Sequence, residues 1–232
     1  MRFTCLEHWF LLLSGRCNCA YNMAMDEALM QLTPELGAPV LRFYGWTELA
    51  ASFGYFQKIA EIERATNLRP LVRRPTGGGL VPHDADWTYS VAVPPSHPWY
   101  HLRAEQSYER AHRWVQAAFA RLGVSTELAL CARLEGPGQC FVGYEKHDVL
   151  QGGRKIAGAA QRRTKTGLLI QGSIQPQPRG ISRHAWELAM CGWAAQEWQV
   201  IWDTLQPDGK LEECAKDLAL KNYSQETFNR KR

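Results

Sequence analysis

The sequence has no long hydrophobic run, no strong excess of one charge and no internal repeat. The apolar stretch from Trp9 to Gly15 is too short to span a membrane and follows Glu7 and His8, so we expect a first strand rather than a signal peptide. The 27 Lys and Arg residues only slightly outnumber the 23 Asp and Glu residues, giving a net charge of +4. This balance does not by itself indicate nucleic-acid binding, but it would suit an acidic protein partner.

Cysteine is present without the pattern of a disulfide scaffold or a zinc site. The seven cysteines are an odd number spread along 232 residues, which indicates reduced thiols in a cytoplasmic protein. Cys17 and Cys19 have no second pair at zinc-finger spacing, so we expect no metal. Most cysteines are small buried hydrophobes, and we expect this of Cys5, Cys131, Cys191 and Cys214.

Strand-like alternation interrupted by a few helical patterns predicts an α+β domain. The region after the Gly/Pro loop at 131–139 predicts an antiparallel meander, with turns at Gly152-Gly153 and near Lys165. The chain from Ile181 onward is expected to be helical, with its tryptophans in the core. The other expected helices are Asn22–Leu32 with Asn22 as N-cap, Lys58–Thr66 and Ala104–Leu122.

The stretch RRPTGGGLVPHD combines two arginines, a glycine run and a histidine. Consecutive glycines let the backbone approach a ligand closely and turn its N–H groups toward an acceptor. Arg73 and Arg74 could add charge-assisted hydrogen bonds. The run has neither Walker nor dinucleotide spacing, and a simple turn explains it equally well. His83 alone could be a base, a ligand anchor or a satisfied polar residue.

Lys155 and Cys140 are the two residues whose surroundings suggest chemistry. Lys155 is followed by Ile156 and the small residues 157–160, which leave room for a flat or linear ligand. Surface lysines are usually just solvated, but one in apolar surroundings can activate a thiol and stabilise an oxyanion. Cys140 lies between the Gly/Pro loop and the same predicted meander. Together they suggest an acyl carrier, in which a thiolate attacks a thioester and the acyl group passes to an amine.

Seven segments occur in the order seen in the biotin/lipoate protein ligase superfamily, and they cover roughly residues 9–175, about seven-tenths of the chain. The combination most resembles the cysteine-dependent octanoyltransferases, which move octanoyl groups from acyl carrier protein to lipoyl domains. The segments are YNMAMDEAL, RFYGW, GYFQ, RRPTGGGLVPHD, TYSV, CF at Cys140 and RKIAGAAQRR…GLLIQGSI.

The resemblance implies a fold and a set of site residues. The fold would be a mixed, largely antiparallel sheet flanked by helices, forming one domain over residues 1–232. Residues 176–232 would be a helical extension of unassigned role. Cys140 would form the acyl thioester, and Lys155 would be the active-site lysine. The acyl and pantetheine site would be walled or lined by Arg74, Thr76, Gly77, Gly78, Gly79, His83, Gly158 and Ala159.

Other activities on this fold remain open. The sequence ADWTYSV after the His-Asp pair is similar to the transferases, whereas ligases usually read Gly-Asn there. Gln171 departs from the His that relatives commonly carry before Gly-Ser-Ile, which counts against a proton relay at that position. A transferase needs no cofactor, because its donor is already an activated thioester. The alternatives are an ATP-dependent lipoate–protein ligase, an octanoyl amidotransferase between lipoyl domains, and a non-catalytic acyl-binding relative.

The partners implied by the resemblance are small acidic domains. They are acyl carrier protein as donor and a lipoyl domain as acceptor, either the glycine cleavage H protein or the E2 of a 2-oxoacid dehydrogenase. We expect neither a nucleic-acid nor a membrane partner. Arg162, Arg163 and Lys165, at a predicted hairpin tip, are candidate docking residues, although a solvated turn explains each of them as well.

Overall fold

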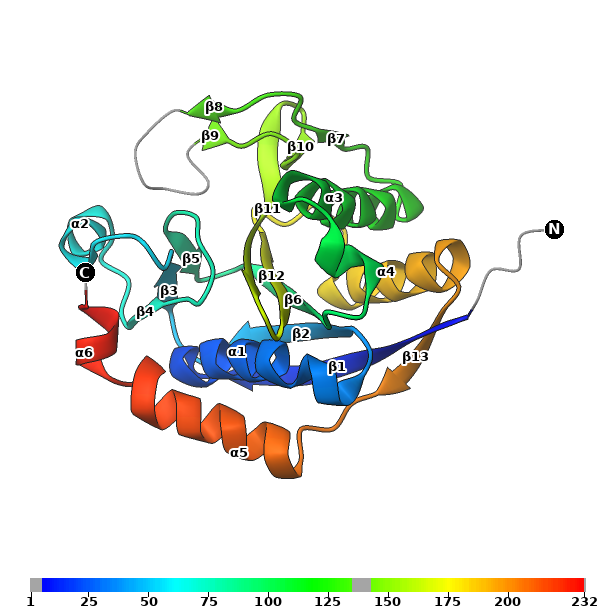
Figure 1. The fold of residues 1–232 in the computed structure, drawn as a ribbon. Helices are drawn as coiled ribbons and strands as arrows, with labels where there is room; N and C mark the ends of the chain where they lie inside the picture. Colours follow the sequence, from blue (N-terminus) through cyan, green and yellow to red (C-terminus); the bar gives the residue numbers. More distant parts are fainter. Residues whose placement is uncertain (1–5, 135–142, 232) are drawn as a thin grey trace.

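A mixed eight-stranded sheet lies at the centre of the computed structural model, which describes residues 6–134 and 143–231 (Figure 1). β1 pairs in parallel with both β13 and β2, and the other neighbouring strands of this sheet are antiparallel. The predicted fold class is therefore confirmed. In sheet order the strands are β13 (Val200–Thr204), β1 (Glu7–Cys17), β2 (Val40–Trp46), β6 (Trp87–Val93), β12 (Gly167–Ile174), β11 (Arg154–Thr164), β10 (Val149–Gln151) and β7 (Glu127–Leu128).

Helices cover both faces of this sheet (Figure 1). α1 (Cys19–Leu36) packs on one face with α5 (Gly209–Leu218) against it, and α3 (Ala104–Arg121) and α4 (Arg183–Glu197) lie on the other. Trp114 and Trp186 are fully buried on the α3 and α4 side, while Leu12 and Leu29 are buried on the α1 side. Apolar burial on both faces is what holds the layers together. The expectation that the C-terminal tryptophans are core or packing surface is confirmed, because Trp186 is buried in the core and Trp193, Trp198 and Trp202 pack against it.

α1 begins earlier than its apolar pattern predicts. Asn18, not Asn22, is the N-cap, and its side chain accepts a hydrogen bond from the Tyr21 backbone N–H. Asn22 is instead fully buried within the helix, where its amide donates to the carbonyls of Cys17 and Gly45. The prediction failed because a buried asparagine whose hydrogen bonds are satisfied is tolerated inside a helix, and its partners come from distant strands.

A smaller sheet stands at one end of the large one. It consists of β4 (Leu71–Arg73), β3 (Ala50–Phe53) and β5 (Val81–His83), with α2 (Ile59–Ala65) and α6 (Glu226–Asn229) beside it (Figure 1). The side chain of Arg73 is fully buried and donates to the carbonyls of Tyr55, Gln57 and Asn229. Arg73 therefore ties the small sheet to the C-terminal helix, instead of offering its hydrogen bonds to a ligand as the sequence suggested.

The predicted turns of the meander are correct, whereas the C-terminal segment contains a strand that was not predicted. The turns at 152–153 and 165–166 are confirmed, since they join β10 to β11 and β11 to β12. From Ile181 onward the helices are confirmed as α4, α5, the short turn η2 (Ala219–Tyr223) and α6, but β13 is a strand. β13 forms by pairing along β1, more than 180 residues away in the sequence, and such a non-local partner leaves little local pattern. A β8 (Arg133–Leu134) and β9 (Gly143–Tyr144) pair and η1 (Pro98–His101) complete the elements.

Candidate functional site

A concave pocket lies where β11 and β12 of the large sheet face β3 and β5 of the small one. Its lining combines apolar and small residues with polar and charged side chains. Such a mixture is typical of sites for small ligands. The lining residues are Met23, Tyr44, Trp46, Ser52, Arg74, Val81, His83, Thr88, Lys155, Gly158, Ala159, Ala160, Gln171, Gly172 and Ser173.

Lys155 on β11 lines this pocket and forms an ion pair with the buried carboxylate of Asp148. Its Nζ lies 2.7 Å from Oδ2 of Asp148, and the two side chains are 7% and 0% exposed. The Tyr108 hydroxyl donates to Oδ1 of Asp148, and the Glu145 backbone N–H donates to Oδ2. Burial, followed by the charge of Asp148, raises the pKa of Tyr108 well above its usual value, so the phenol stays a donor. The strand, the helix α3 and this carboxylate together fix the ammonium group in place.

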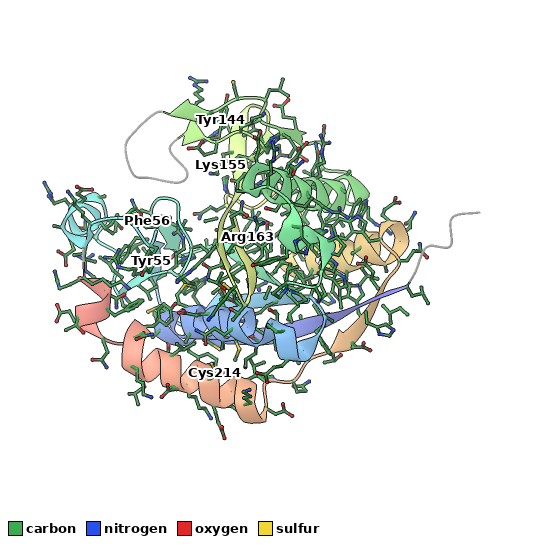
Figure 2. All side chains as sticks on the ribbon, in the orientation of Figure 1. Tyr55, Phe56, Tyr144, Lys155, Arg163 and Cys214 are labelled. Atoms are coloured by element: carbon green, nitrogen blue, oxygen red, sulfur yellow. The ribbon has the colours of Figure 1, made fainter. Side chains whose placement is uncertain are left out.

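Gly158 provides the space that Lys155 occupies. A Cβ atom at this position would lie 2.5 Å from Cε and 2.6 Å from Nζ of Lys155. Any larger residue would therefore push the lysine side chain away from Asp148. Figure 2 shows Lys155 on β11, on the same side of the molecule as Tyr144 of β9, and the two residues line a second, wider cleft next to the pocket. Arg133 and Arg154 also line that cleft, and together with Lys155 they outnumber its acidic lining residue Asp84, which favours phosphate groups.

The glycine run is folded around the side chain of Arg74. Arg74 donates from Nε to the carbonyl of Gly77 at 3.0 Å and from Nη2 to that of Gly79 at 2.7 Å. Gly78 adopts a φ of +82°, and a Cβ on Gly54 would lie only 1.8 Å from the Gly78 carbonyl oxygen. Gly54 and Gly78 are thus needed because the backbone at residue 54 passes close to the backbone of the glycine run. This close approach places Arg74 at the pocket wall.

The predicted site residues divide into two groups. Arg74, His83, Lys155, Gly158 and Ala159 line the pocket together. Thr76, Gly77 and Gly79 do not line the pocket but bind residues that do. The Thr76 hydroxyl donates to Oε1 of Gln171, and the carbonyls of Gly77 and Gly79 accept from Arg74. Cys140 lies outside the described residues, so its meeting with Lys155 stays a prediction.

A buried ionic network below the pocket was not predicted. Asp26 and Arg42 form an ion pair at 2.7 Å with both side chains fully buried. Asp26 also accepts hydrogen bonds from the Tyr44 hydroxyl, the Ser90 hydroxyl and the Gln171 amide. Burial and the charge of Asp26 raise the pKa of Tyr44, which keeps it protonated. Gln171 therefore joins the pocket to a satisfied structural network, a role that no local pattern in the sequence indicates.

Sequence reasoning also missed a chain of hydrogen bonds through Ser52, His83 and Asp86. The hydroxyl of Ser52 lies 2.8 Å from Nε2 of His83, and Nδ1 of His83 lies 3.0 Å from Oδ2 of Asp86. Ser173 and Thr88 also donate to this oxygen. Burial by itself raises the pKa of Asp86, but the electrostatic interaction with His83 and these three hydrogen bonds outweigh it and lower the pKa. The available signal was the acidic residue three positions after His83.

The described cysteines that were expected to be buried are less buried than predicted. Cys131 is exposed, so the prediction was wrong there, because the loop after β7 runs along the surface. Cys191 and Cys214 are only partly buried, and Cys5 lies outside the described residues. Burial nevertheless raises the pKa of Cys191 to about 12, which leaves its thiol unreactive.

The part of the chain that the structure describes has neither a membrane-spanning helix nor a metal-binding cluster. No helix there has both the length and the apolar character needed to cross a membrane. Within residues 6–134 and 143–231, no three His, Cys, Asp or Glu side chains are grouped in a way that could hold a metal ion.

Comparison with known sequences yields one family and a consistent set of relatives. The model of the lipoyl protein ligase A/B catalytic domain matches residues 18–178. Curated relatives include the octanoyltransferase LipM of Macrococcus caseolyticus, 38% identical over 182 residues, and that of Geobacillus kaustophilus, 39% identical over 181 residues. Each match covers 72% of this chain and 66% or 65% of the relative. The chain thus matches slightly less than two thirds of their length.

Solved structures share the fold at low sequence identity. A putative lipoate protein ligase from T. acidophilum with bound lipoic acid superposes with a TM-score of 0.77 at 21% identity, covering 98% of this chain and 100% of that one. A lipoate-protein ligase A bound with ATP gives a TM-score of 0.77 at 22% identity, covering 97% and 99%. At these identities the likeness establishes the architecture alone.

Proposed function

Because this chain belongs to the lipoyl protein ligase A/B catalytic-domain family, we propose that it is an octanoyltransferase. It would move an octanoyl group from acyl carrier protein, through a thioester on Cys140, to a lysine of a lipoyl domain. The observation that carries this proposal is the pocket in which a small-residue wall meets the Lys155 ammonium group. The sequence similarity of the chain to curated octanoyltransferases supports the same reaction.

The pocket suits the proposed chemistry in two ways. The acyl chain would lie along the wall formed by Met23, Val81 and the residues 158–160 of β11. The Lys155 ammonium would stabilise the negative charge that develops on the thioester carbonyl oxygen during attack, an effect that fixed charges provide best in a water-poor site. Exchange between two thioesters is nearly isoenergetic and amide formation is downhill, so the reaction requires no nucleotide.

Mass spectrometry of the intact protein tests the proposal. We expect incubation with octanoyl-acyl carrier protein, without ATP, to add one octanoyl group to Cys140. The Cys140→Ala variant should form no adduct. Cys131→Ala is the matched control, because Cys131 is an exposed thiol outside the pocket, and it should load normally. Loading of Cys140→Ala to the wild-type level would disprove the covalent route.

An ATP-dependent ligase is the second candidate. The wide cleft beside the pocket carries Arg133, Arg154 and Lys155, which could bind the phosphates of a nucleotide. Lipoylation of an acceptor domain only when ATP is added would favour this activity over the transferase. Acyl transfer from an octanoylated lipoyl domain, but not from acyl carrier protein, would favour an amidotransferase. The absence of both transfer and adduct would leave a non-catalytic acyl-binding protein.

The proposed partners are acidic domains that meet a mildly basic surface. Arg163 and Lys165 are exposed at the turn between β11 and β12, and Figure 2 labels Arg163 on this hairpin. Arg162 is less available, because it lies over the Tyr55 ring and donates to the Pro75 carbonyl. Docking of acyl carrier protein or of a lipoyl domain would therefore use Arg163 and Lys165.

A further inference from the structure

The acceptor lysine in the proposed reaction needs a base. An ordinary lysine has a pKa near 10.4, so at neutral pH roughly one in a few thousand is uncharged and able to attack. In the pocket, Nζ of Lys155 is already engaged with the buried carboxylate of Asp148, 2.7 Å away. A base for the acceptor lysine has to reach the same pocket.

Ser52, His83 and Asp86 form such a group. Ser52 and His83 line the pocket that Lys155 also lines. The three side chains are 2%, 5% and 8% exposed, and they are joined by hydrogen bonds of 2.8 Å and 3.0 Å. The ring of Trp46 stacks on the imidazole of His83 with centroids 3.7 Å apart, which holds the plane of the imidazole. A hydroxyl, an imidazole and a buried carboxylate in this order are the elements of a general-base relay.

The surrounding donors determine the direction of every proton at the Asp86 end. The Thr88 hydroxyl accepts from Nε1 of Trp46 at 2.7 Å, so its own proton is directed to Asp86. In the same way the Ser173 hydroxyl accepts from the Gln175 amide, so its proton also points to Asp86. Asp86 thus receives hydrogen bonds as a carboxylate.

This carboxylate fixes the tautomer of His83. Because Oδ2 of Asp86 accepts, Nδ1 of His83 carries the proton, and Nε2 is left as the acceptor. The Ser52 hydroxyl accepts from Nη1 of Arg74 at 3.3 Å and therefore turns its proton toward Nε2. Each bond in the chain has a consistent donor and acceptor, and the chain ends on a hydroxyl at the pocket wall.

We propose that Ser52, His83 and Asp86 form a proton relay that deprotonates the acceptor lysine of the lipoyl domain; this inference rests on the proposed octanoyltransferase function. The lysine ammonium gives one proton to Oγ of Ser52, while the Ser52 hydroxyl proton passes to Nε2 of His83. The amine nitrogen then forms a bond to the thioester carbonyl carbon, and the bond from that carbon to sulfur breaks. The second proton of the amine leaves with the sulfur as a thiol, and His83 returns its extra proton to water. Asp86 holds the imidazolium that forms.

The experiment compares two nucleophiles on the same acyl-enzyme. Wild type and His83→Gln are loaded with octanoyl-acyl carrier protein without ATP and freed of donor. Each is then mixed with a lipoyl domain or with hydroxylamine, which is unprotonated at neutral pH and needs no base. We expect the His83→Gln acyl-enzyme, whatever its rate of loading, to react normally with hydroxylamine. Its transfer to the lipoyl domain should fall by roughly 100-fold, the usual contribution of a general base.

Two further variants sharpen this comparison. Asp86→Asn keeps the size of the side chain but removes the charge that fixes the His83 tautomer, and it should show the same split between nucleophiles. His8→Gln is the matched control, because His8 has a similar contact to Asp203, at 2.9 Å, on the exposed β1 and β13 strands. It should behave as wild type with both nucleophiles.

Several results would overturn the relay. Equal loss with the lipoyl domain and hydroxylamine would show a structural role, and no loss with either would show that the base lies elsewhere. Failure of both His83→Gln and Asp86→Asn to load would assign the three residues to the fold or to the first half-reaction. A wild-type protein that forms no acyl-enzyme would overturn the proposed function itself, and this inference with it.

Discussion

Lys155 shows how much one side chain depends on partners that come from other elements. Its ammonium group is useful as a fixed charge because Asp148, Tyr108 and the Glu145 backbone hold it from one side. Burying two charges costs free energy that only a well-satisfied pair recovers. A change to the Lys155–Asp148 pair is therefore expected to alter both the position of the ammonium group and the stability of the folded protein.

Replacing Asp148 by Asn tests this dependence. The substitution leaves a buried lysine charge without its counter-charge, so we expect the free energy of unfolding to fall by about 3 kcal/mol. Octanoyl transfer should fall by about 100-fold, since the ammonium would lose its fixed position. Urea unfolding and single-turnover transfer measure the two effects.

Glu105→Gln is the matched control for Asp148→Asn. It removes the partner of Lys146 from an ion pair of the same 2.7 Å length that is largely exposed to solvent. We expect little change in either measurement, because water screens exposed pairs. Equal effects of both substitutions would contradict a special role for the buried pair.

At the level of the elements, β11 shapes the pocket through the small residues that follow Lys155. Gly158 faces Ser173 across the β11 and β12 pairing, and Ala159 faces Gly172. The strand thus presents one cation and a smooth wall to the same cavity. A strand with larger side chains here would keep its backbone hydrogen bonds but lose the pocket.

Gly158→Ala should disturb the Lys155–Asp148 pair without removing either charge. The added Cβ would lie 2.5 Å from the Lys155 side chain, which would have to move away from Asp148. We therefore expect a loss in stability of up to about 3 kcal/mol, and a loss in transfer of at least about 10-fold. Urea unfolding and acyl-transfer rates provide the measurements. Gly192→Ala on α4 serves as the control, because the nearest atom to its Cβ is 3.8 Å away, and it should leave transfer unchanged.

Stability of the whole molecule should depend on pH through His112 of α3. Burial lowers the pKa of His112 to about 4 from an ordinary value of 6.5, and it outweighs the opposite effect of Asp148. Between pH 6.5 and 4 the unfolded chain binds a proton that the folded protein excludes. The free energy of unfolding should therefore fall as the pH drops through this window, by on the order of 3 kcal/mol.

Urea unfolding at several pH values measures this dependence. In His112→Leu the corresponding part of the loss should disappear, because the substituted side chain cannot bind a proton. Some dependence should remain from His97, whose pKa is also lowered by burial. Identical pH profiles for wild type and His112→Leu would contradict the assignment.

The sequence was informative wherever a structural signal is local. The periodicity of α3 and the turns at 152–153 and 165–166 are each encoded within a short segment, and the structure confirms them. β13 and the N-terminal start of α1 were not predicted correctly. β13 depends on pairing with β1, and Asn22 depends on acceptors that a distant strand provides.

The sequence by itself determined the family, the α+β class and several residues that line the pocket, including Arg74, His83 and Lys155. These depend on motifs that are contiguous in the chain. Only the tertiary structure decided the partners of those residues. Asp148 meets Lys155 across a hairpin, and Ser52 meets His83 because β3 pairs with β5. Hydrogen bonds and ion pairs act over about 3 Å, so the folded arrangement of strands, rather than their order, determines which charges and protons can interact.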